Sequence, residues 1–309
     1  MSDGFLSLPD AAAVFRVATF DEASLPVYAL SGPAQGPALL LGHANGLAAG
    51  SYGPWLADLA RDAQIFAFDA RGHGGATWPA GPLDTVFSRA RVAADLDVVL
   101  RAVRERSPGR ALYYVGHSLG AAAAIDLLIA GGMADLVAIM LIEPPIFPPP
   151  ELPVHEEAEL LQARLVDGTG RRRSSWPSIE AFAARLKNGK GPFARFAPEM
   201  LEAHCRATLR PSPDGGFTLA CPPEVEAAIF AIHWRADTWR HLHRIERPLD
   251  LVGGDPNRPD RDWIARAIPD MARQMTRAQL TQLAGSSHLM VQEEPARLLA
   301  LVRRWLGIG

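Results

Sequence analysis

The sequence has little cysteine, little excess charge and no long apolar run. Only two of its 309 residues are cysteines, Cys205 and Cys221, which excludes a disulfide-stabilised scaffold and favours a reducing compartment, the cytoplasm. The formal net charge is −3, with acidic and basic residues interspersed, so nothing favours a nucleic-acid partner. No uncharged apolar stretch approaches membrane-spanning length, and the first residues lack the charged and apolar regions of a signal peptide. We therefore expect a cytoplasmic globular protein that binds neither nucleic acid nor membrane.

The sequence also lacks side-chain clusters that would hold a metal ion or a charged polymer. His204, His241 and His243 have no carboxylates or cysteines at ligand spacing, so no metal and no other cofactor is expected. The basic run Arg171-Arg172-Arg173 is short and lies in a polar segment, which is typical of a solvated turn.

Eight short apolar runs bounded by turn residues predict β-strands, at residues 15–20, 27–30, 38–41, 65–68, 111–115, 136–142, 249–252 and 278–283. The first three runs lie close together in the sequence, which predicts an antiparallel meander. From residue 38 onward the runs alternate with helical segments, which predicts right-handed crossovers and parallel strands. The expected fold is therefore α/β, a twisted, mostly parallel eight-stranded sheet flanked by helices.

Residues 144–247 break this alternation. The segment starts with a proline-rich stretch, Pro144 to Pro150, and continues with helical patterns at 156–166 and 179–186. We expect a mainly helical cap inserted into a core formed by residues 1–143 and 248–309. Because the insertion follows the carboxyl end of a strand, it would cover the crevice where open α/β sheets bind ligands.

One pentapeptide between a predicted strand and a predicted helix has the form of a nucleophile turn. It is Gly116-His117-Ser118-Leu119-Gly120, which follows the apolar run 111–115 and precedes an alanine-rich helical stretch. The glycines allow strand and helix to pass closely, and the turn exposes the hydroxyl of Ser118 at a helix N-terminus. This context makes Ser118 the candidate nucleophile.

A serine needs a base and an orienting carboxylate to act as a nucleophile. His288 lies in a glycine-containing loop after the last predicted strand and is the candidate base. Asp255 directly follows the strand at 249–252 and is the first choice for the acid, in the chain order serine, acid, histidine. Glu143 also ends a strand at the same edge of the sheet and is the alternative acid.

The negative charge that develops on a substrate carbonyl needs N–H donors. One donor should be the backbone N–H of Leu119, the residue after the nucleophile, and the other should come from the loop after the third strand. That loop is Gly42-His43-Ala44-Asn45-Gly46. We expect the backbone N–H of Asn45 to be the second donor, and its side-chain amide could add a further one.

Taken together, these segments resemble the α/β-hydrolase superfamily, and most closely its cap-bearing bacterial serine hydrolases. The similar segments are His43-Ala44-Asn45-Gly46, the residues 68–74 after the fourth strand, Gly116 to Gly120, and Gly285-Ser286-Ser287-His288. The resemblance implies the fold described above and gives Ser118, His288, Asn45 and Leu119 the same roles. The sequence departs from the family pattern at Ala44, where a glycine is usual, and in the short loop before Asp255. The second departure leaves both acid candidates, Asp255 and Glu143, open.

The expected activity is hydrolysis of a small to medium carboxylic ester, lactone or thioester through an acyl-enzyme. Aromatic residues of the cap, including Phe147, Phe193 and Phe230, suggest a substrate with an apolar part, although most cap aromatics should form the cap's own core. The alternatives are a carbon–carbon (diketone-type) hydrolase, perhydrolase or lyase with the same site, and a non-catalytic small-ligand receptor. A homodimer is compatible with the sequence, but no pattern requires one.

Overall fold

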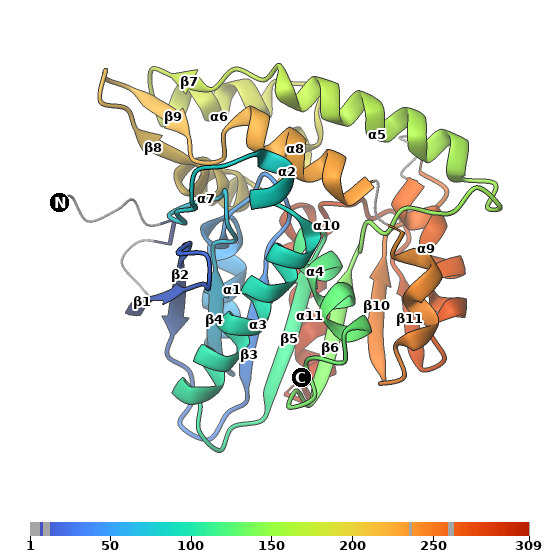
Figure 1. Ribbon diagram of the computed structural model, residues 1–309. Coiled ribbons are helices and arrows are strands. Elements are labelled where there is room, and N and C mark those ends of the chain that lie inside the picture. The colour runs from blue at the N-terminus through green and yellow to red at the C-terminus, as the bar shows by residue number, and fades with distance from the viewer. Residues whose placement is uncertain (1–6, 9–12, 235–236, 259–262, 309) are drawn as a thin grey trace.

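The predicted strands form a single sheet in the structure (Figure 1). The computed structural model describes the chain except for residues 1–6, 9–12, 235–236, 259–262 and 309. The strand order is β1-β2-β4-β3-β5-β6-β10-β11. The strands are β1 (Ala13–Ala18), β2 (Ser24–Leu30), β3 (Ala38–Gly42), β4 (Gln64–Phe68), β5 (Leu112–His117), β6 (Ala138–Ile142), β10 (Leu249–Gly253) and β11 (Ala278–Gln282). The expected mostly parallel, eight-stranded α/β sheet is confirmed.

The prediction of an initial three-stranded meander was wrong. β1 and β2 are antiparallel, but β2 pairs next with β4, and β3 lies between β4 and β5, parallel to both. All five residues of β3 are buried, whereas β1 is largely exposed. A strand that is apolar on both faces needs a covered central position. Burial, rather than closeness in sequence, therefore decides which strands β3 pairs with.

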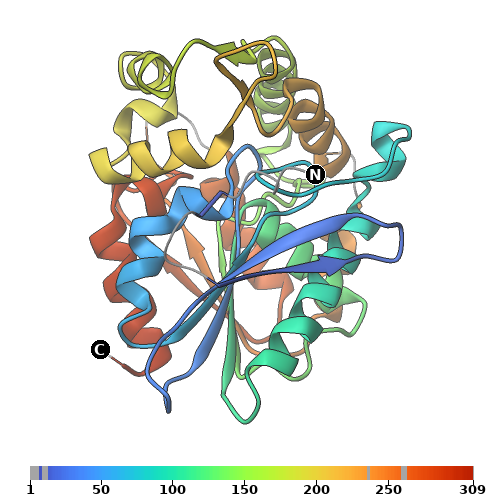
Figure 2. The same ribbon diagram turned by 90° about the vertical axis from the view of Figure 1, so that its left-hand side faces the viewer.

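Helices cover both faces of the sheet (Figure 2). On one face lie α1 (Gly53–Leu59) and α11 (Pro295–Leu306), with the 3-10 helix η1 (Ala49–Tyr52); on the other lie α3 (Arg89–Arg106), α4 (Leu119–Ile129) and α9 (Trp263–Gln274). Within β3, Leu40 packs toward α3 and α4, whereas Leu39 and Leu41 pack toward α1 and α11. This alternation follows from the two-residue period of a strand. Two short helices, α2 (Leu83–Val86) and α10 (Met290–Glu293), lie in connecting loops.

Residues 144–247, which we call the cap segment, lie between β6 and β10 in the sequence and above the carboxyl ends of the strands in space (Figure 1). The predicted helices are present as α5 (His155–Gly170) and α6 (Ile179–Lys187). The segment also has a small sheet that was not predicted, in the order β7-β9-β8. Its other elements are β7 (Ser175–Trp176), η2 (Pro192–Arg195), α7 (Pro198–Thr208), β8 (Leu209–Pro211), β9 (Phe217–Leu219), α8 (Pro223–Trp234) and η3 (Trp239–Arg244).

Candidate active site

Ser118 occupies a sharp turn between β5 and α4. Its backbone has φ 50° and ψ −107°, a conformation that non-glycine residues rarely adopt and that often marks a functional site. The flanking glycines are required by close contacts. A Cβ atom at Gly120 would lie 2.3 Å from the carbonyl oxygen of Gly42, and one at Gly116 would lie 2.8 Å from the nitrogen of Ala121. The spacing of glycines in the sequence therefore reflects the crossing of β3, β5 and α4.

His288 lies beside Ser118, although 170 residues separate them in the sequence. Its Nε2 atom lies 3.0 Å from the Ser118 hydroxyl oxygen, and its Nδ1 atom lies 3.2 Å from Glu143 Oε2. Because Nδ1 faces a carboxylate, it carries the ring proton of the neutral imidazole, and Nε2 accepts from the serine hydroxyl. The structure thus brings together Ser118, His288 and Glu143.

Glu143 follows β6 and is fully buried, at 0% exposure. Its backbone has φ 49°, and its N–H donates to the carbonyl of Val252 at 2.8 Å. Its Oε1 atom accepts from the N–H of Gly254 at 2.5 Å, which leaves Oε2 to face the imidazole. The two carboxylate oxygens therefore have separate partners. Oε1 accepts from Gly254, which follows β10, and Oε2 faces His288.

Asp255, the first choice for the acid, does not face the imidazole. Its carboxylate accepts from the backbone N–H groups of Gly285 and Asn257, each at 2.8 Å. The hydrogen bond from Gly285, followed by that from Asn257, lowers the pKa of Asp255. The prediction that Asp255 pairs with His288 was wrong: its side chain stabilises the two loops, and Glu143 occupies the position beside the base.

The two backbone N–H groups predicted to donate to an oxyanion belong to Leu119 and Asn45. Leu119 is the first residue of α4, and Asn45 is the second residue of a turn closed by the Leu47 N–H donating to the Ala44 carbonyl at 3.1 Å. In the described part of the chain, neither the N–H of Leu119 nor that of Asn45 has a hydrogen-bond acceptor. The side-chain amide of Asn45 is not free, however, because it donates to the carbonyl of Glu226 at 3.0 Å. The backbone N–H groups are the available donors.

His117, the residue before Ser118, connects several parts of the site. Its Nε2 atom lies 2.8 Å from the carbonyl oxygen of His288. A carbonyl only accepts, so Nε2 carries the proton and Nδ1 accepts from the Tyr52 hydroxyl at 2.6 Å. That hydroxyl in turn accepts from the N–H of Ala44 at 3.2 Å. Burial lowers the pKa of His117 to about 3, so the ring is neutral.

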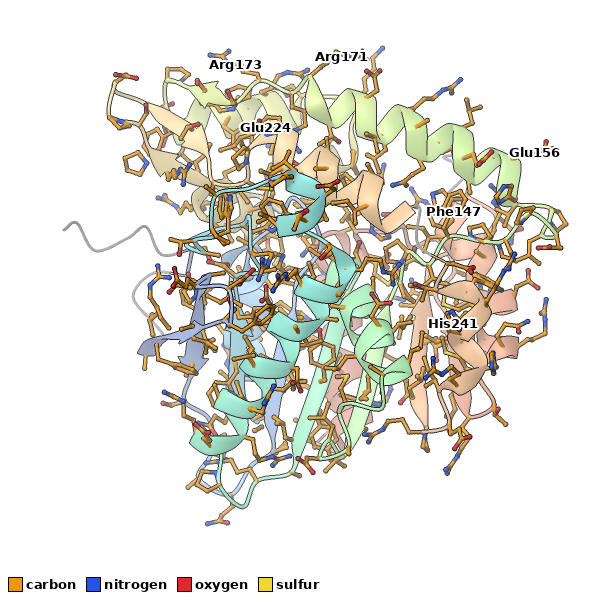
Figure 3. All side chains as sticks on the ribbon, viewed as in Figure 1. Phe147, Glu156, Arg171, Arg173, Glu224 and His241 are labelled. Carbon is orange, nitrogen blue, oxygen red and sulfur yellow. The ribbon has the colours of Figure 1, made fainter. Side chains whose placement is uncertain are left out.

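Ser118 and His288 open into a cavity of about 570 Å³ between the core and the cap segment. Phe147, at the junction of these two parts (Figure 3), contributes to its wall. The other large apolar side chains of the wall are Leu47, Leu165, Phe193, Phe230, Trp263, Ile264 and Leu289. By contrast, Trp176, Phe182 and Phe196 pack into the cap segment's own core. Some aromatic residues of the cap segment therefore line the cavity, and others form the segment's own core.

The basic run at 171–173 is a solvated turn only in part. Arg171 and Arg173 lie at the outer surface of the cap segment (Figure 3). Arg172 instead lines the cavity, where its Nη1 atom donates to both carboxylate oxygens of Glu226, at 2.7 and 2.5 Å. Neither Arg172 nor Glu226 was predicted as a site residue; the charge at Glu226 within the apolar pattern of α8 was the available signal.

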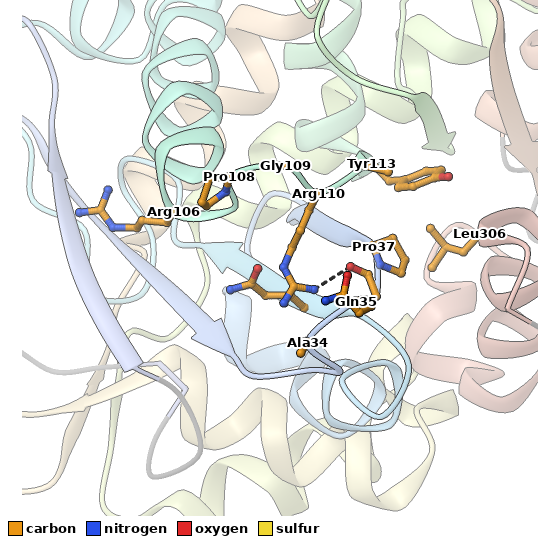
Figure 4. Close-up of a pocket in the computed structure, with 12 residues that line it drawn as sticks. Ala34, Gln35, Pro37, Arg106, Pro108, Gly109, Arg110, Tyr113 and Leu306 are labelled. Carbon is orange, nitrogen blue, oxygen red and sulfur yellow. Dashed lines mark hydrogen bonds between the residues drawn. The ribbon is translucent and has the colours of Figure 1, made fainter.

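A larger cavity of about 740 Å³ lies at the opposite end of the sheet (Figure 4). It is near the amino ends of β3 and β5, and Arg110 spans it by donating to the carbonyls of Pro33 and Gly36. None of the predicted site residues lines this cavity. Size alone would therefore have selected the wrong end of the sheet.

Within the described ranges, no three or more histidine, cysteine or carboxylate side chains are grouped so that they could hold a metal ion. Both cysteines are buried, and burial raises the pKa of each thiol, to about 12 for Cys205. The described helices include none with the length and apolar character needed to cross a bilayer.

Comparisons with known proteins agree with this architecture. A search of curated proteins finds no match. The crystal structure of E-2-(acetamidomethylene)succinate hydrolase is similar, with 21% identity, a TM-score of 0.73, and coverage of 96% of this chain and 99% of that one. The thioesterase domain from the curacin biosynthetic pathway has 21% identity, a TM-score of 0.67 and coverage of 95% and 99%. Esterase RhEst1 from Rhodococcus sp. ECU1013 has 21% identity, a TM-score of 0.67 and coverage of 96% and 99%. At these identities, the likeness concerns the fold.

The family comparison covers most of the chain. Residues 39–301 match the family described as "Alpha/beta hydrolase family". This range includes Ser118, His288, Glu143 and the whole cap segment. The chain belongs to the alpha/beta hydrolase family.

Proposed function

We propose that this hydrolase cleaves a small to medium carboxylic ester, lactone or thioester through an acyl-enzyme on Ser118. The observation that carries the proposal is the 3.0 Å contact between Ser118 Oγ and His288 Nε2 on the wall of the largely apolar cavity. The solved structures of similar fold named above include an esterase and a thioesterase domain, which supports ester-type substrates.

In the proposed reaction, the Ser118 oxygen attacks the substrate carbonyl while His288 Nε2 takes the hydroxyl proton. Glu143 holds the imidazole in the required orientation and stabilises the positive charge that forms on it. The N–H groups of Leu119 and Asn45 donate to the developing oxyanion. The imidazolium then protonates the leaving group, and a water molecule activated by His288 releases the acid from Ser118.

The cavity supports a substrate with an apolar part of short to medium length. A volume of about 570 Å³ is within the range typical of small-molecule sites. The walls contributed by Phe147, Phe193 and Phe230 favour an aliphatic or aromatic group next to the scissile carbonyl. No lining residue favours the carbon–carbon hydrolase alternative specifically.

The test is hydrolysis of p-nitrophenyl esters from acetate to octanoate by the wild-type protein and by Ser118→Ala. We expect the wild type to hydrolyse at least one of these esters and kcat to fall by at least about 10⁴-fold in the variant. The variant's thermal unfolding serves as the folding control. A folded Ser118→Ala protein with wild-type kcat would contradict the proposal, and turnover of a diketone panel without any ester would favour the alternative.

A further inference from the structure

We propose that Arg172 and Glu226 of the cap segment position the oxyanion turn, so that the cap completes the catalytic site. Both are positioning residues, because they act through the turn at Ala44 to Leu47 rather than on the substrate. This inference rests on the proposed function, since it assigns the Asn45 N–H to the oxyanion.

The turn itself needs support from outside. Gly46, its third residue, has φ +75°, the conformation that a type II turn requires at this position. The closing bond from Leu47 to Ala44 leaves the Asn45 N–H free for a ligand. The direction of that N–H therefore depends on what holds Asn45 and Gly46.

Two of the contacts that hold the turn come from Glu226, 181 residues away from Asn45. The backbone carbonyl of Glu226 accepts from the Asn45 side-chain amide at 3.0 Å. The Glu226 carboxylate lies close to Gly46, where a Cβ atom would be only 2.4 Å from Oε1. A third contact comes from the core, where the Gly46 N–H donates to His73 Nε2 at 3.0 Å.

The position of the Glu226 carboxylate depends on Arg172. The Glu226 side chain is only 7% exposed, and a buried carboxylate without a partner is strongly unfavourable. Burial raises the pKa of Glu226, and the charge and hydrogen bonds of Arg172 oppose that rise. Arg172 follows α5 and Glu226 is in α8, two helices that pack together, so the ion pair joins two elements of the cap segment beside the turn.

Without Arg172, the unpaired carboxylate would leave its place against Gly46, and the Asn45 N–H would lose its direction. We expect Arg172→Gln to lower kcat by about 10- to 100-fold with KM changed by less than about threefold, because a misplaced oxyanion donor acts on the transition state. Arg172→Lys keeps a cation beside Glu226 and should retain most of the activity. Arg171→Gln is the matched control, since Arg171 is exposed and pairs with Asp167 on the surface.

A variant that lacks the charges of both Arg172 and Glu226 distinguishes an effect on the position of the turn from a loss of protein stability. Glu226→Gln keeps the backbone carbonyl and the side-chain shape, so we expect a reduction in kcat of less than about fivefold. In the double variant Arg172→Gln/Glu226→Gln no carboxylate is left unpaired, and kcat should return to the level of Glu226→Gln. If Arg172→Gln alone fails to fold, the double variant still tests the inference, since a kcat well below that of Glu226→Gln would overturn it.

The experiment measures kcat and KM for p-nitrophenyl butyrate, with active sites counted by stoichiometric fluorophosphonate labelling. Inhibition by phenylboronic acid, which forms a tetrahedral adduct on a reactive serine, should weaken in parallel with kcat/KM. The inference is overturned by an Arg172→Gln protein with wild-type kcat per labelled site, by an effect on KM alone, or by additive losses in the double variant. A wild-type protein that neither labels nor hydrolyses esters would overturn the proposed function itself.

Discussion

The side chain of His117 donates to the backbone carbonyl of His288 at 2.8 Å, so the residue before Ser118 holds the loop that carries His288. The other ring nitrogen accepts from Tyr52, whose hydroxyl also accepts from the N–H of Ala44. One neutral imidazole therefore connects the turn at Ser118, the loop that carries His288 and the loop at Ala44.

This relationship predicts that His117→Phe lowers kcat by about tenfold, because it removes both hydrogen bonds while keeping a ring in the same space. His117→Gln, whose amide can still donate to the carbonyl of His288, should lose less. The measurement is kcat for p-nitrophenyl butyrate per labelled active site, with the exposed residue His243 changed to Gln as the control. Equal activity of the wild type and His117→Phe would show that the contact is only structural.

The geometry of the two carboxylates predicts opposite effects of two similar substitutions. Glu143→Gln should lower kcat by about 10³- to 10⁴-fold, because the amide cannot orient the imidazole and stabilise its charge as the carboxylate does. Asp255→Asn removes only acceptors for Gly285 and Asn257 and should change kcat by less than about threefold. Steady-state hydrolysis measures both. A large loss in Asp255→Asn with an active Glu143→Gln would restore the acid first chosen from the sequence.

The cavity predicts that Gly168 controls the length of the substrate. Gly168 lies on α5 in the cavity wall, and a Cβ atom there would meet no other atom within 4 Å. Gly168→Phe should therefore fill part of the cavity and raise KM for the octanoate ester by about tenfold or more, with little change for acetate. Gly168→Ala is the control, since it adds helix propensity of about 1 kcal/mol without reaching across the cavity. Unchanged chain-length preference in Gly168→Phe would refute this role.

The buried histidines predict that the protein loses stability in mild acid. Burial lowers the pKa of His73, His117 and His204 from 6.5 to about 3 each. Between these values the unfolded chain binds protons that the folded chain does not, so their stabilising contribution is complete above pH 6.5 and is lost as the pH falls toward 3. Each histidine contributes a slope of up to about 1.4 kcal/mol per pH unit.

Urea unfolding at several pH values between 7.5 and 4.5 measures this slope. His204→Phe should reduce the slope by up to about 1.4 kcal/mol per pH unit, whatever its effect on stability at neutral pH. His241→Gln, a change at an exposed position (Figure 3), should leave it unchanged. The account of the buried histidines fails if both variants keep the wild-type slope.

The fold could be predicted because its strands have strong local signals. β3 and β6 are continuous apolar runs, and such runs are typical of strands covered on both faces. Strand pairing was less predictable: β3 is adjacent to β2 in sequence, but its buried position between β4 and β5 depends on distant parts of the chain. The cytoplasmic location, the partners and the oligomeric state stay predictions.

The site could be predicted only as far as chain order allows. Ser118 and His288 follow from their turns, but Glu143 and Asp255 both end strands at the same edge of the sheet, and no sequence rule decides which one reaches the imidazole. The choice depends on three-dimensional contacts, since the N–H groups of Gly285 and Asn257 take up the Asp255 carboxylate. The inward position of Arg172 could not be predicted for a similar reason. It depends on the buried carboxylate of Glu226, which is distant in the sequence.

The role of Ser118 as the nucleophile is tested most directly by covalent labelling of the wild-type protein with a fluorophosphonate, with the modified residue located by mass spectrometry. We expect one adduct per chain, on the hydroxyl of Ser118, and strongly reduced labelling of a folded His288→Ala protein. An adduct on another residue, or equal labelling of Ser118 without the imidazole, would contradict this role.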